Sequence, residues 1–206
     1  AQAIGADFHF SNGTTHKVGT IGHIGCTSFY PSKNLGCYGD GGALFSNDDA
    51  LASRMKTISN HGQSSRYNYD MIGVNSRLDS MQAVILNAKL PYLNSYIEAR
   101  QTAAAFYDAA FAQQEAITTP HRSPYSSHVF HQYTLKVDAL HRDKLQAYLK
   151  EKGIPSMIYY PKALHLQKAY NYLSTDLANS LVFAVKSEFL HFSGSGRQSF
   201  RKQRKK

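Results

Sequence analysis

Apolar residues recur at helical spacing in the middle of the chain. Between positions 78 and 90 they occupy positions 78, 81, 85, 86 and 90, which form one face of an amphipathic helix. Pro91 suits the first turn of a second helix, which we expect to continue to about residue 111. A shorter helix is predicted over residues 48–59, with Asn47 or Asp48 as its N-cap.

Shorter apolar runs predict strands on both sides of these helices. Residues 20–28 and 43–46 enclose a glycine-rich turn, and residues 61–75 read as a polar, aromatic-rich loop. The later part of the chain predicts a βαβ-like unit. Its expected parts are a strand over 131–137, a helix over 141–152 that Gly153 stops, and a strand over 154–160. The whole pattern indicates an α/β fold.

The turn between the first two strands carries Lys33, within the segment TSFYPSKNLGCYGDGGALFSND. Pro31 pushes Tyr30 toward an extended conformation, so the strand must end close to this point. Four glycines between positions 34 and 42 allow the backbone to turn sharply and to approach a flat cofactor. A desolvated lysine here can condense with an aldehyde. Thr27 and Ser28 can point their hydroxyls at a phosphate of the same molecule, as the binding of pyridoxal phosphate requires. The alternative is a solvated, inert lysine in a glycine-rich loop.

Resemblance favours the chemical interpretation. TSFYPSKNLGCYGDGG resembles the lysine motif of the DegT/StrS-type sugar aminotransferases, which are pyridoxal phosphate enzymes of the aspartate aminotransferase superfamily, fold type I. Four further segments resemble the same family in the same order, over roughly residues 1–175. They are AQAIGA, HGQSSRYNYDMIGVNSRLDSMQAVIL, HQYTLKV and IYYPKALHLQKAY. The segments HGQ and GVNSRLD are most similar to those of the branch that aminates 3-keto UDP-N-acetylhexuronic acids for the sugars of bacterial O-antigen.

The resemblance implies a cofactor site. Lys33 would form the Schiff base with pyridoxal 5′-phosphate and would shuttle the proton during transfer. Ser28 would hold the phosphate, and Gln2 would lie beside the ring hydroxyl. Asn75 matches an asparagine that contacts the phosphate bound in the partner subunit, which implies a homodimer with composite active sites. The structural alternatives are a strand-end hydroxyl for Ser28 and a helix N-cap for Asn75.

The resemblance also implies a keto-sugar nucleotide as the acceptor, an amino acid such as glutamate as the donor, and ping-pong kinetics. Tyr160 falls where the family places a residue near the sugar nucleotide, although a core aromatic is the alternative. Arg66 and Arg77 are candidates for binding a carboxylate or a diphosphate in bidentate fashion. Either arginine could equally be a surface ion-pair partner.

The family comparison predicts how the chain is organised. Residues 1–90 would belong to the large pyridoxal phosphate domain, 91–113 to an interdomain helix and 114–176 to a small α/β domain. In the family, an aspartate three positions before that of Gln2 pairs with the ring nitrogen, and it would precede Ala1 here. We therefore expect a fragment of a protein about twice this length. A catalytically inactive fragment is the second interpretation.

The net charge of +9 is concentrated at the end of the chain. Six of the last ten residues, RQSFRKQRKK, are basic. A nucleic-acid-binding module is therefore a third interpretation. The favoured one is a disordered, non-family tail over residues 177–206 produced by a frameshift or truncation, with no nucleic-acid partner.

Other features of the sequence limit the classes of protein to which this chain can belong. A hydrophobic content of 42% is ordinary for a globular protein, and no apolar run approaches the length of a membrane span. Without a signal-peptide pattern we expect a cytoplasmic protein with no membrane partner, whose Cys26 and Cys37 are free thiols. The histidines lack the spacing of a metal site, so no zinc is expected.

Overall fold

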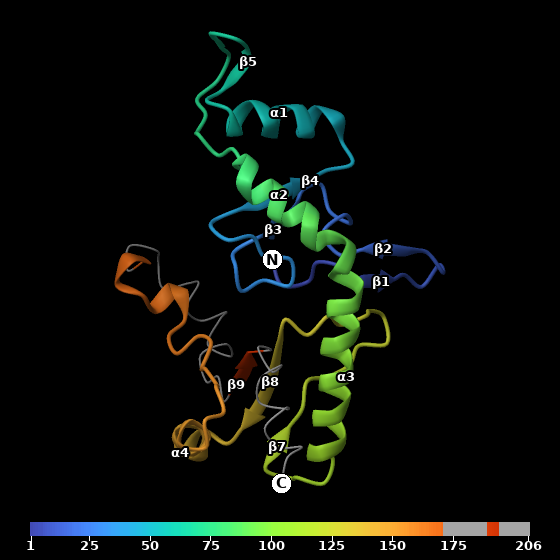
Figure 1. Cartoon of the computed structure of the whole chain (residues 1–206), viewed down its shortest axis with the longest axis vertical. Helices are drawn as coiled ribbons and strands as arrows, with labels where there is room; N and C mark the ends of the chain where they lie inside the picture. The colour runs from blue at the N-terminus through green and yellow to red at the C-terminus, as the bar shows by residue number, and fades with distance from the viewer. Residues whose placement is uncertain (171–188, 194–206) are drawn as a thin grey trace. The chain divides into compact units, whose positions relative to one another are not determined.

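The computed structural model describes residues 1–170 and 189–193. The chain divides into two compact units (Figure 1). The first contains residues 1–103 and 122–131, and the second contains 104–121 and the described part of 132–206. The division falls within the long helix α3, Leu93–Phe111. A return of residues 122–131 to the first unit was not expected from the sequence, because the predicted domains were continuous segments.

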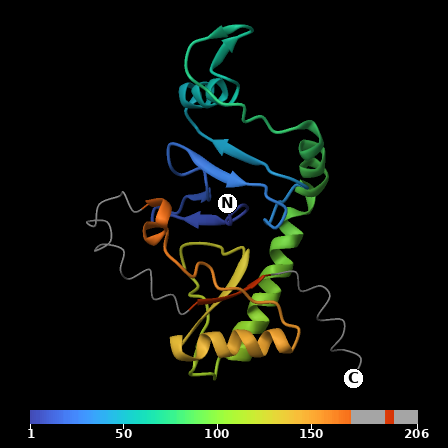
Figure 2. The same cartoon turned by 90° about the vertical axis from the view of Figure 1, so that its left-hand side faces the viewer.

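The strands of the first unit form three antiparallel pairs. The lysine turn connects the central pair, in which Gly25 lies opposite Phe45 and Ser28 lies opposite Gly42. The predicted loop over residues 61–75 contains a short hairpin, so the loop prediction was incomplete. The pairs are β1 (Asp7–His9) with β2 (Thr15–Lys17), β3 (Gly25–Ser28) with β4 (Gly42–Phe45), and β5 (Gln63–Ser65) with β6 (Asn68–Tyr69) (Figures 1 and 2).

The predicted helices of the first unit are present. Helix α1 spans Asp49–Ser59, and the side chain of Asp48 caps it by accepting from the backbone of Ala50 and Leu51. Helix α2 spans Ser80–Lys89 and leads through the 3₁₀ turn η1, Leu90–Tyr92, directly into α3. The N-cap of α2 is Asp79, so the alternative role of Asn75 as a helix cap is wrong.

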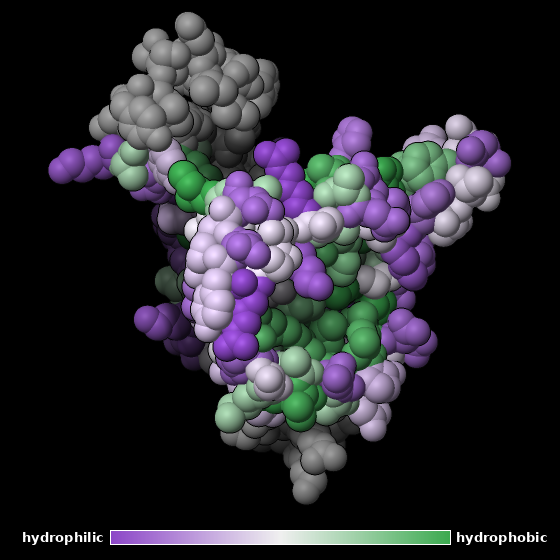
Figure 3. All heavy atoms as spheres, turned by 90° about the horizontal axis from the view of Figure 1, so that it is seen from above, coloured by the Kyte–Doolittle hydropathy of each residue, from purple (hydrophilic) through white to green (hydrophobic). Residues whose placement is uncertain are grey.

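The core of the first unit joins the lysine turn to α2 and α3. It contains Ala6, Phe29, Leu35, Cys37, Leu86, Leu93, Ile97 and Val129. Only part of the predicted apolar stripe of α2 is buried, because Leu86 is 8% exposed whereas Met81 is 72% exposed. Apolar surface therefore remains open to solvent, and Figure 3 shows green apolar side chains gathered in a hollow bordered by hydrophilic ones.

The second unit contains an antiparallel three-stranded sheet in the order β7-β8-β9. Its elements are β7 (Ile117–Thr118), β8 (Gln132–Val137), α4 (Ala139–Glu151), η2 (Leu164–Leu166), η3 (Lys168–Tyr170) and β9 (Phe189–Ser193). The predicted strand at 131–137 and the helix at 141–152 are present. No named strand covers residues 154–160, so the predicted βαβ-like unit is wrong: β8 pairs antiparallel with β7 and β9 instead.

Strand β9 lies within the range 177–206, for which the sequence predicted disorder. That prediction does not hold for residues 189–193, and the rest of the range lies outside the described residues. In the part of the chain that the structure describes, no helix has the length and hydropathy needed to cross a membrane.

A substitution at Gly36 tests how tightly the lysine turn is packed. A Cβ atom on Gly36 would lie 2.5 Å from the carbonyl oxygen of Pro31 and 2.9 Å from that of Tyr30. Because both neighbours are backbone atoms, Gly36→Ala must displace the turn, and we expect a loss of about 2–4 kcal/mol in the free energy of unfolding, measured by urea titration. The matched control is Gly22→Ala, whose Cβ meets nothing within 4 Å. Equal stability of the two variants would contradict this packing.

Candidate active site at the lysine turn

Backbone hydrogen bonds close the turn that carries Lys33. Strand β3 ends at Ser28, and the amide of Phe29 then donates to the carbonyl oxygen of Gly41 at 2.7 Å. The amide of Lys33 donates to Tyr30 at 2.8 Å, and that of Cys37 donates to Phe29, also at 2.8 Å. Lys33 is therefore fixed at its main chain.

Side chains anchor the same turn from both sides. Leu35 is 4% exposed and Cys37 is fully buried, with its Sγ donating to the carbonyl oxygens of Phe29 at 2.9 Å and Gly39 at 3.0 Å. From α2, the Nζ of Lys89 donates to the carbonyl oxygen of Gly36 at 2.6 Å. The prediction of free thiols is confirmed, because Cys37 and the exposed Cys26 are both unbridged.

Among the described residues, the amine of Lys33 and the hydroxyl hydrogen of Ser28 have no hydrogen-bond acceptor. The amine of Lys33 is half-buried, and no acceptor or carboxylate in the described part of the chain pairs with it. Ser28 is also half-buried, and its Oγ accepts from the amide of Tyr30 at 3.2 Å. Its hydroxyl hydrogen has no acceptor among the described residues. The amine and the hydroxyl can therefore both serve a ligand.

Thr27 does not share this arrangement with Ser28. Successive side chains of a strand point to opposite faces, and Thr27 lines a hollow that Ser28 does not line. The Oγ1 of Thr27 is buried without a hydrogen-bond partner among the described residues. Thr27 and Ser28 therefore differ in their surroundings, and Ser28 remains the candidate on the strand.

Two residues next to Lys33 were not singled out by sequence reasoning. Nδ1 of His131 lies 3.0 Å from Oδ1 of Asn34, and both side chains are buried. Burial, followed by the positive charges of Lys33 and Arg100, lowers the pKa of His131 to about 4. His131 is therefore neutral at physiological pH. The HQYTLKV segment begins with this histidine, but no local signal links it to Asn34, 97 positions earlier.

The remaining predicted cofactor residues lie on the surface. Gln2 is exposed in the segment before β1. Asn75 is exposed after the β5–β6 hairpin, where its backbone bridges to Asn60. The Oδ1 of Asn75 accepts from Nε of Arg77 at 3.2 Å. The structure thus brings the side chains of Asn75 and Arg77 together at an exposed position.

The other substrate candidates are also exposed. Arg66 lies between β5 and β6, where its Nη2 donates to the hydroxyl of Tyr67 at 3.2 Å and its guanidinium lies 5.0 Å from the Tyr67 ring. Neither Arg66 nor Arg77 forms an ion pair with a carboxylate of the described residues. Tyr160 is 72% exposed, so its alternative role as a core aromatic is wrong. It belongs to the second unit.

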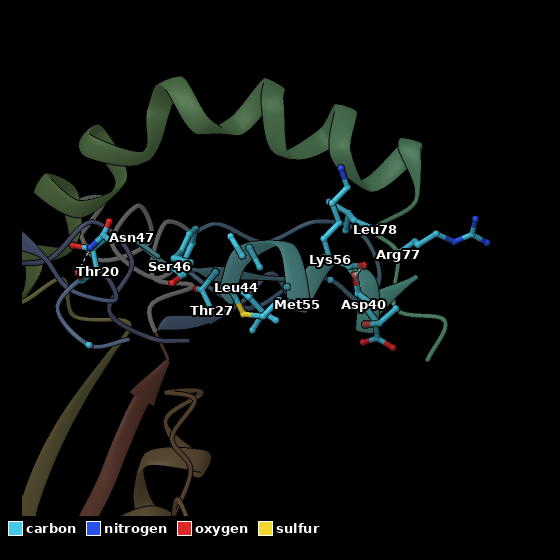
Figure 4. A pocket seen from close by; sticks show the side chains of 18 residues that line it. Thr20, Thr27, Asp40, Leu44, Ser46, Asn47, Met55, Lys56, Arg77 and Leu78 are labelled. Carbon is cyan, nitrogen blue, oxygen red and sulfur yellow. Dashed lines mark hydrogen bonds between the residues drawn. The ribbon is translucent and has the colours of Figure 1, made fainter. Parts of the chain in front are cut away.

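The first unit also has a hollow of about 970 Å³ between β4, α1 and the start of α2 (Figure 4). Among the predicted site residues only Arg77 lines it, and Figure 4 shows the Arg77 side chain extending away from the other labelled residues. Lys33 and Ser28 do not line it. The lysine turn, where the unpaired amine lies, is therefore the candidate site, and it is separate from the hollow.

Comparison with known proteins shows the family of the chain. The profile of the DegT/DnrJ/EryC1/StrS aminotransferase family matches residues 1–188. The chain belongs to this family. The family match extends beyond residue 176, so the prediction that the resemblance ends there is corrected.

Two further comparisons, one with a curated relative and one with a solved structure, give the extent of the similarity. The UDP-2-acetamido-2-deoxy-3-oxo-D-glucuronate aminotransferase of Pseudomonas aeruginosa is 43% identical over 169 residues, which cover 82% of this chain and 45% of that protein. The structure of Streptomyces venezuelae DesV in complex with a ketimine intermediate has a TM-score of 0.85 at 33% identity, covering 98% of this chain and 54% of that one. The predicted aminotransferase fold is thereby confirmed.

A second similar structure, Bacillus subtilis NtdA with bound cofactor PMP, has a TM-score of 0.71 at 28% identity, covering 82% of this chain and 41% of that one. The present chain spans about half the length of the relatives that it matches. The residues present fit such a cofactor, because an unpaired amine and a free hydroxyl hydrogen occur five positions apart on one turn.

The neutral state of His131 predicts a pH dependence of stability. The pKa of His131 is about 4 in the folded protein, below its ordinary value of 6.5. Between these values the unfolded chain binds a proton that the folded one does not, so stability present above pH 6.5 is lost as the pH falls toward 4. We expect His131 to account for a loss of about 2–3 kcal/mol.

Urea titrations at pH 7 and pH 4.5 measure this effect. His131→Asn, which cannot titrate, should lose less stability than the natural protein over the same interval. Identical losses in both proteins would show that His131 is not held in its neutral form.

Proposed function

We propose that this protein is a pyridoxal phosphate-dependent aminotransferase that moves an amino group from an amino acid to a keto-sugar nucleotide. The observation that carries the proposal is the unpaired amine of Lys33 on a turn fixed by its own backbone. Membership of the DegT/StrS family and the 43% identity with the Pseudomonas aeruginosa enzyme support the same reaction class.

Lys33 acts as the amine that holds the cofactor aldehyde and as the base that moves the proton during transfer. When bound, the cofactor supplies a conjugated ring that accepts electrons from the reacting carbon. A lysine amine can perform both tasks only if it is not engaged in an ion pair, and Lys33 has no such partner among the described residues. Because its main chain is fixed, the flexible side chain of Lys33 has fewer conformations from which its amine must find the aldehyde.

Ser28 donates its hydroxyl hydrogen to the cofactor phosphate in this proposal. Its Oγ already accepts from the amide of Tyr30, which orients the remaining hydrogen away from the turn. Gln2, exposed in the segment before β1, would lie beside the ring hydroxyl. These assignments rest on the family motif and on the availability of each group.

The exposed arginines bind the charged parts of the substrates. Arg66 and Arg77 present guanidinium groups that no carboxylate of the described residues neutralises. Planar guanidinium groups suit the diphosphate of a nucleotide sugar and the carboxylate of a hexuronic acid or of glutamate. Tyr160 contacts the sugar nucleotide, for which its exposed hydroxyl and ring are suited.

Each active site is composite in this proposal. The exposed Asn75 contacts the phosphate bound in the partner subunit, so the homodimer is the active species. The further inferences are a cytoplasmic location, glutamate as the donor, and a product used in bacterial cell-surface polysaccharide such as O-antigen. The 3-oxo-glucuronate specificity of the Pseudomonas aeruginosa relative supports this substrate class.

Covalent trapping tests the role of Lys33. Incubation with pyridoxal phosphate, reduction with borohydride and mass mapping of peptides should place the label on Lys33, because its amine is the unpaired one on the turn. Lys33→Ala should abolish the label, and Lys56→Ala, which removes an exposed lysine of the hollow, should leave it unchanged. A label distributed over surface lysines would favour an inactive chain.

Subunit mixing tests the composite site. Lys33→Ala and Asn75→Ala proteins should each have little activity, whereas random pairing of the two restores about a quarter of the natural sites. This follows because one of the two sites in each mixed dimer then contains both natural residues. Activity that stays at the average of the two variants would rule out a role for Asn75 across the subunits.

A further inference from the structure

Asn34 and His131 are both buried polar residues, and their side chains hydrogen-bond to each other. Asn34 directly follows Lys33, whereas His131 directly precedes β8. Their contact joins segments that are 97 positions apart. A buried polar group that loses its hydrogen-bond partner is costly, so the contact between these side chains restrains the position of one segment relative to the other.

The hydrogen bond has a defined direction. The Nδ2 of Asn34 faces the carbonyl oxygen of Val129 at 3.5 Å, and this oxygen can only accept. The Oδ1 of Asn34 therefore faces His131 and must accept as well. Nδ1 of His131 carries the hydrogen, and in the neutral ring Nε2 is the nitrogen with the lone pair.

The segment that presents His131 is itself held in an unfavourable backbone conformation. Phe130 is buried and has a φ of 44°, in the left-handed region that large side chains avoid. Three bonds hold it there. Nη1 of Arg100 in α3 donates to the carbonyl oxygens of Phe130 at 3.1 Å and His131 at 3.2 Å, and the amide of Phe130 donates to Nδ1 of His128 at 2.9 Å.

We propose that His131 is a positioning residue that holds the Lys33 turn in place by donating the hydrogen of Nδ1 to the side-chain oxygen of Asn34. This role rests on the proposed function of Lys33 as the amine that binds the cofactor. Arg100 fixes the histidine segment to α3, the histidine fixes Asn34, and Asn34 fixes the main chain next to the reacting amine.

The neutral state of the His131 ring also suits its position beside the Lys33 amine. Lys33 and Arg100 are the cationic side chains that act on His131, and no carboxylate acts on it. A charged ring would add a further cation beside an amine that must lose its proton before it attacks an aldehyde. A neutral donor therefore positions the turn without placing another positive charge beside the Lys33 amine. A lysine or an arginine at position 131 would add that charge.

Hydrogen exchange tests this role without any cofactor. The peptide covering residues 30–37 contains the amides of Lys33 and Cys37, which donate to Tyr30 and Phe29. His131→Leu removes the donor and should accelerate exchange in this peptide about tenfold relative to α2. His131→Asn keeps a donor at the place of Nδ1 and should restore protection. If His131→Leu does not fold, Asn34→Ser breaks the same contact and should give the same selective loss.

Tyr133→Phe is the matched control, because it removes another hydrogen bond, from Tyr133 Oη to Asp108 at 2.6 Å in the second unit. Its 30–37 peptide should exchange at the natural rate. Unchanged protection in His131→Leu, or equal acceleration in all variants, overturns the positioning role.

Borohydride trapping separates this inference from the proposed function. With pyridoxal phosphate, His131→Leu should lower the label on Lys33 about tenfold and leave the label on other lysines unchanged. If the natural protein shows no label on Lys33, the proposed function fails, and the exchange data still decide whether His131 holds the turn. If Lys33 is labelled equally in all variants, the positioning role is wrong and the function stands.

Discussion

The burial of the residues that follow Lys33 is the constraint on which the rest of the site depends. Leu35 and Cys37 are core residues, packed in the same cluster as Phe29, Leu86 and Leu93. Because the turn cannot shift without opening this core, the main chain of Lys33 is held by hydrophobic packing as well as by its hydrogen bonds. The amine is the part of the turn that remains free to react.

Polar contacts add to this hydrophobic packing in holding the lysine turn in place. A sulfhydryl bonded to two carbonyl oxygens, a lysine of α2 bonded to Gly36 and the Asn34–His131 pair all act on the same short segment. Each satisfies a group that would be costly to bury alone. The cations around His131 favour its neutral ring, so the electrostatic arrangement of the site follows from burial and from the charges that surround it.

Local signals explain which elements the sequence could predict. Helix α1 begins after Asp48 because its carboxylate accepts from the first turn, and Pro91 marks the passage from α2 into α3. The lysine turn was also predictable, since Pro31 and the glycines limit the backbone conformations there. These signals lie within a few residues of the features that they determine.

Long-range contacts explain what the sequence could not predict. Residues 154–160 have a strand-like pattern, but β8 has β7 and β9 as its neighbours, so pairing partners decided the outcome. The opposite faces of Thr27 and Ser28 became clear only with the register of β3 against β4. His131 looked like one histidine among ten, because its partner Asn34 is remote in sequence.

The central claim is that the amine of Lys33 is the point at which this turn binds its cofactor. A crystal structure of the protein grown with pyridoxal phosphate tests it most directly. We predict continuous electron density between Nζ of Lys33 and the cofactor, with the phosphate against Ser28. Cofactor bound elsewhere, or density that ends short of Lys33, would contradict the account.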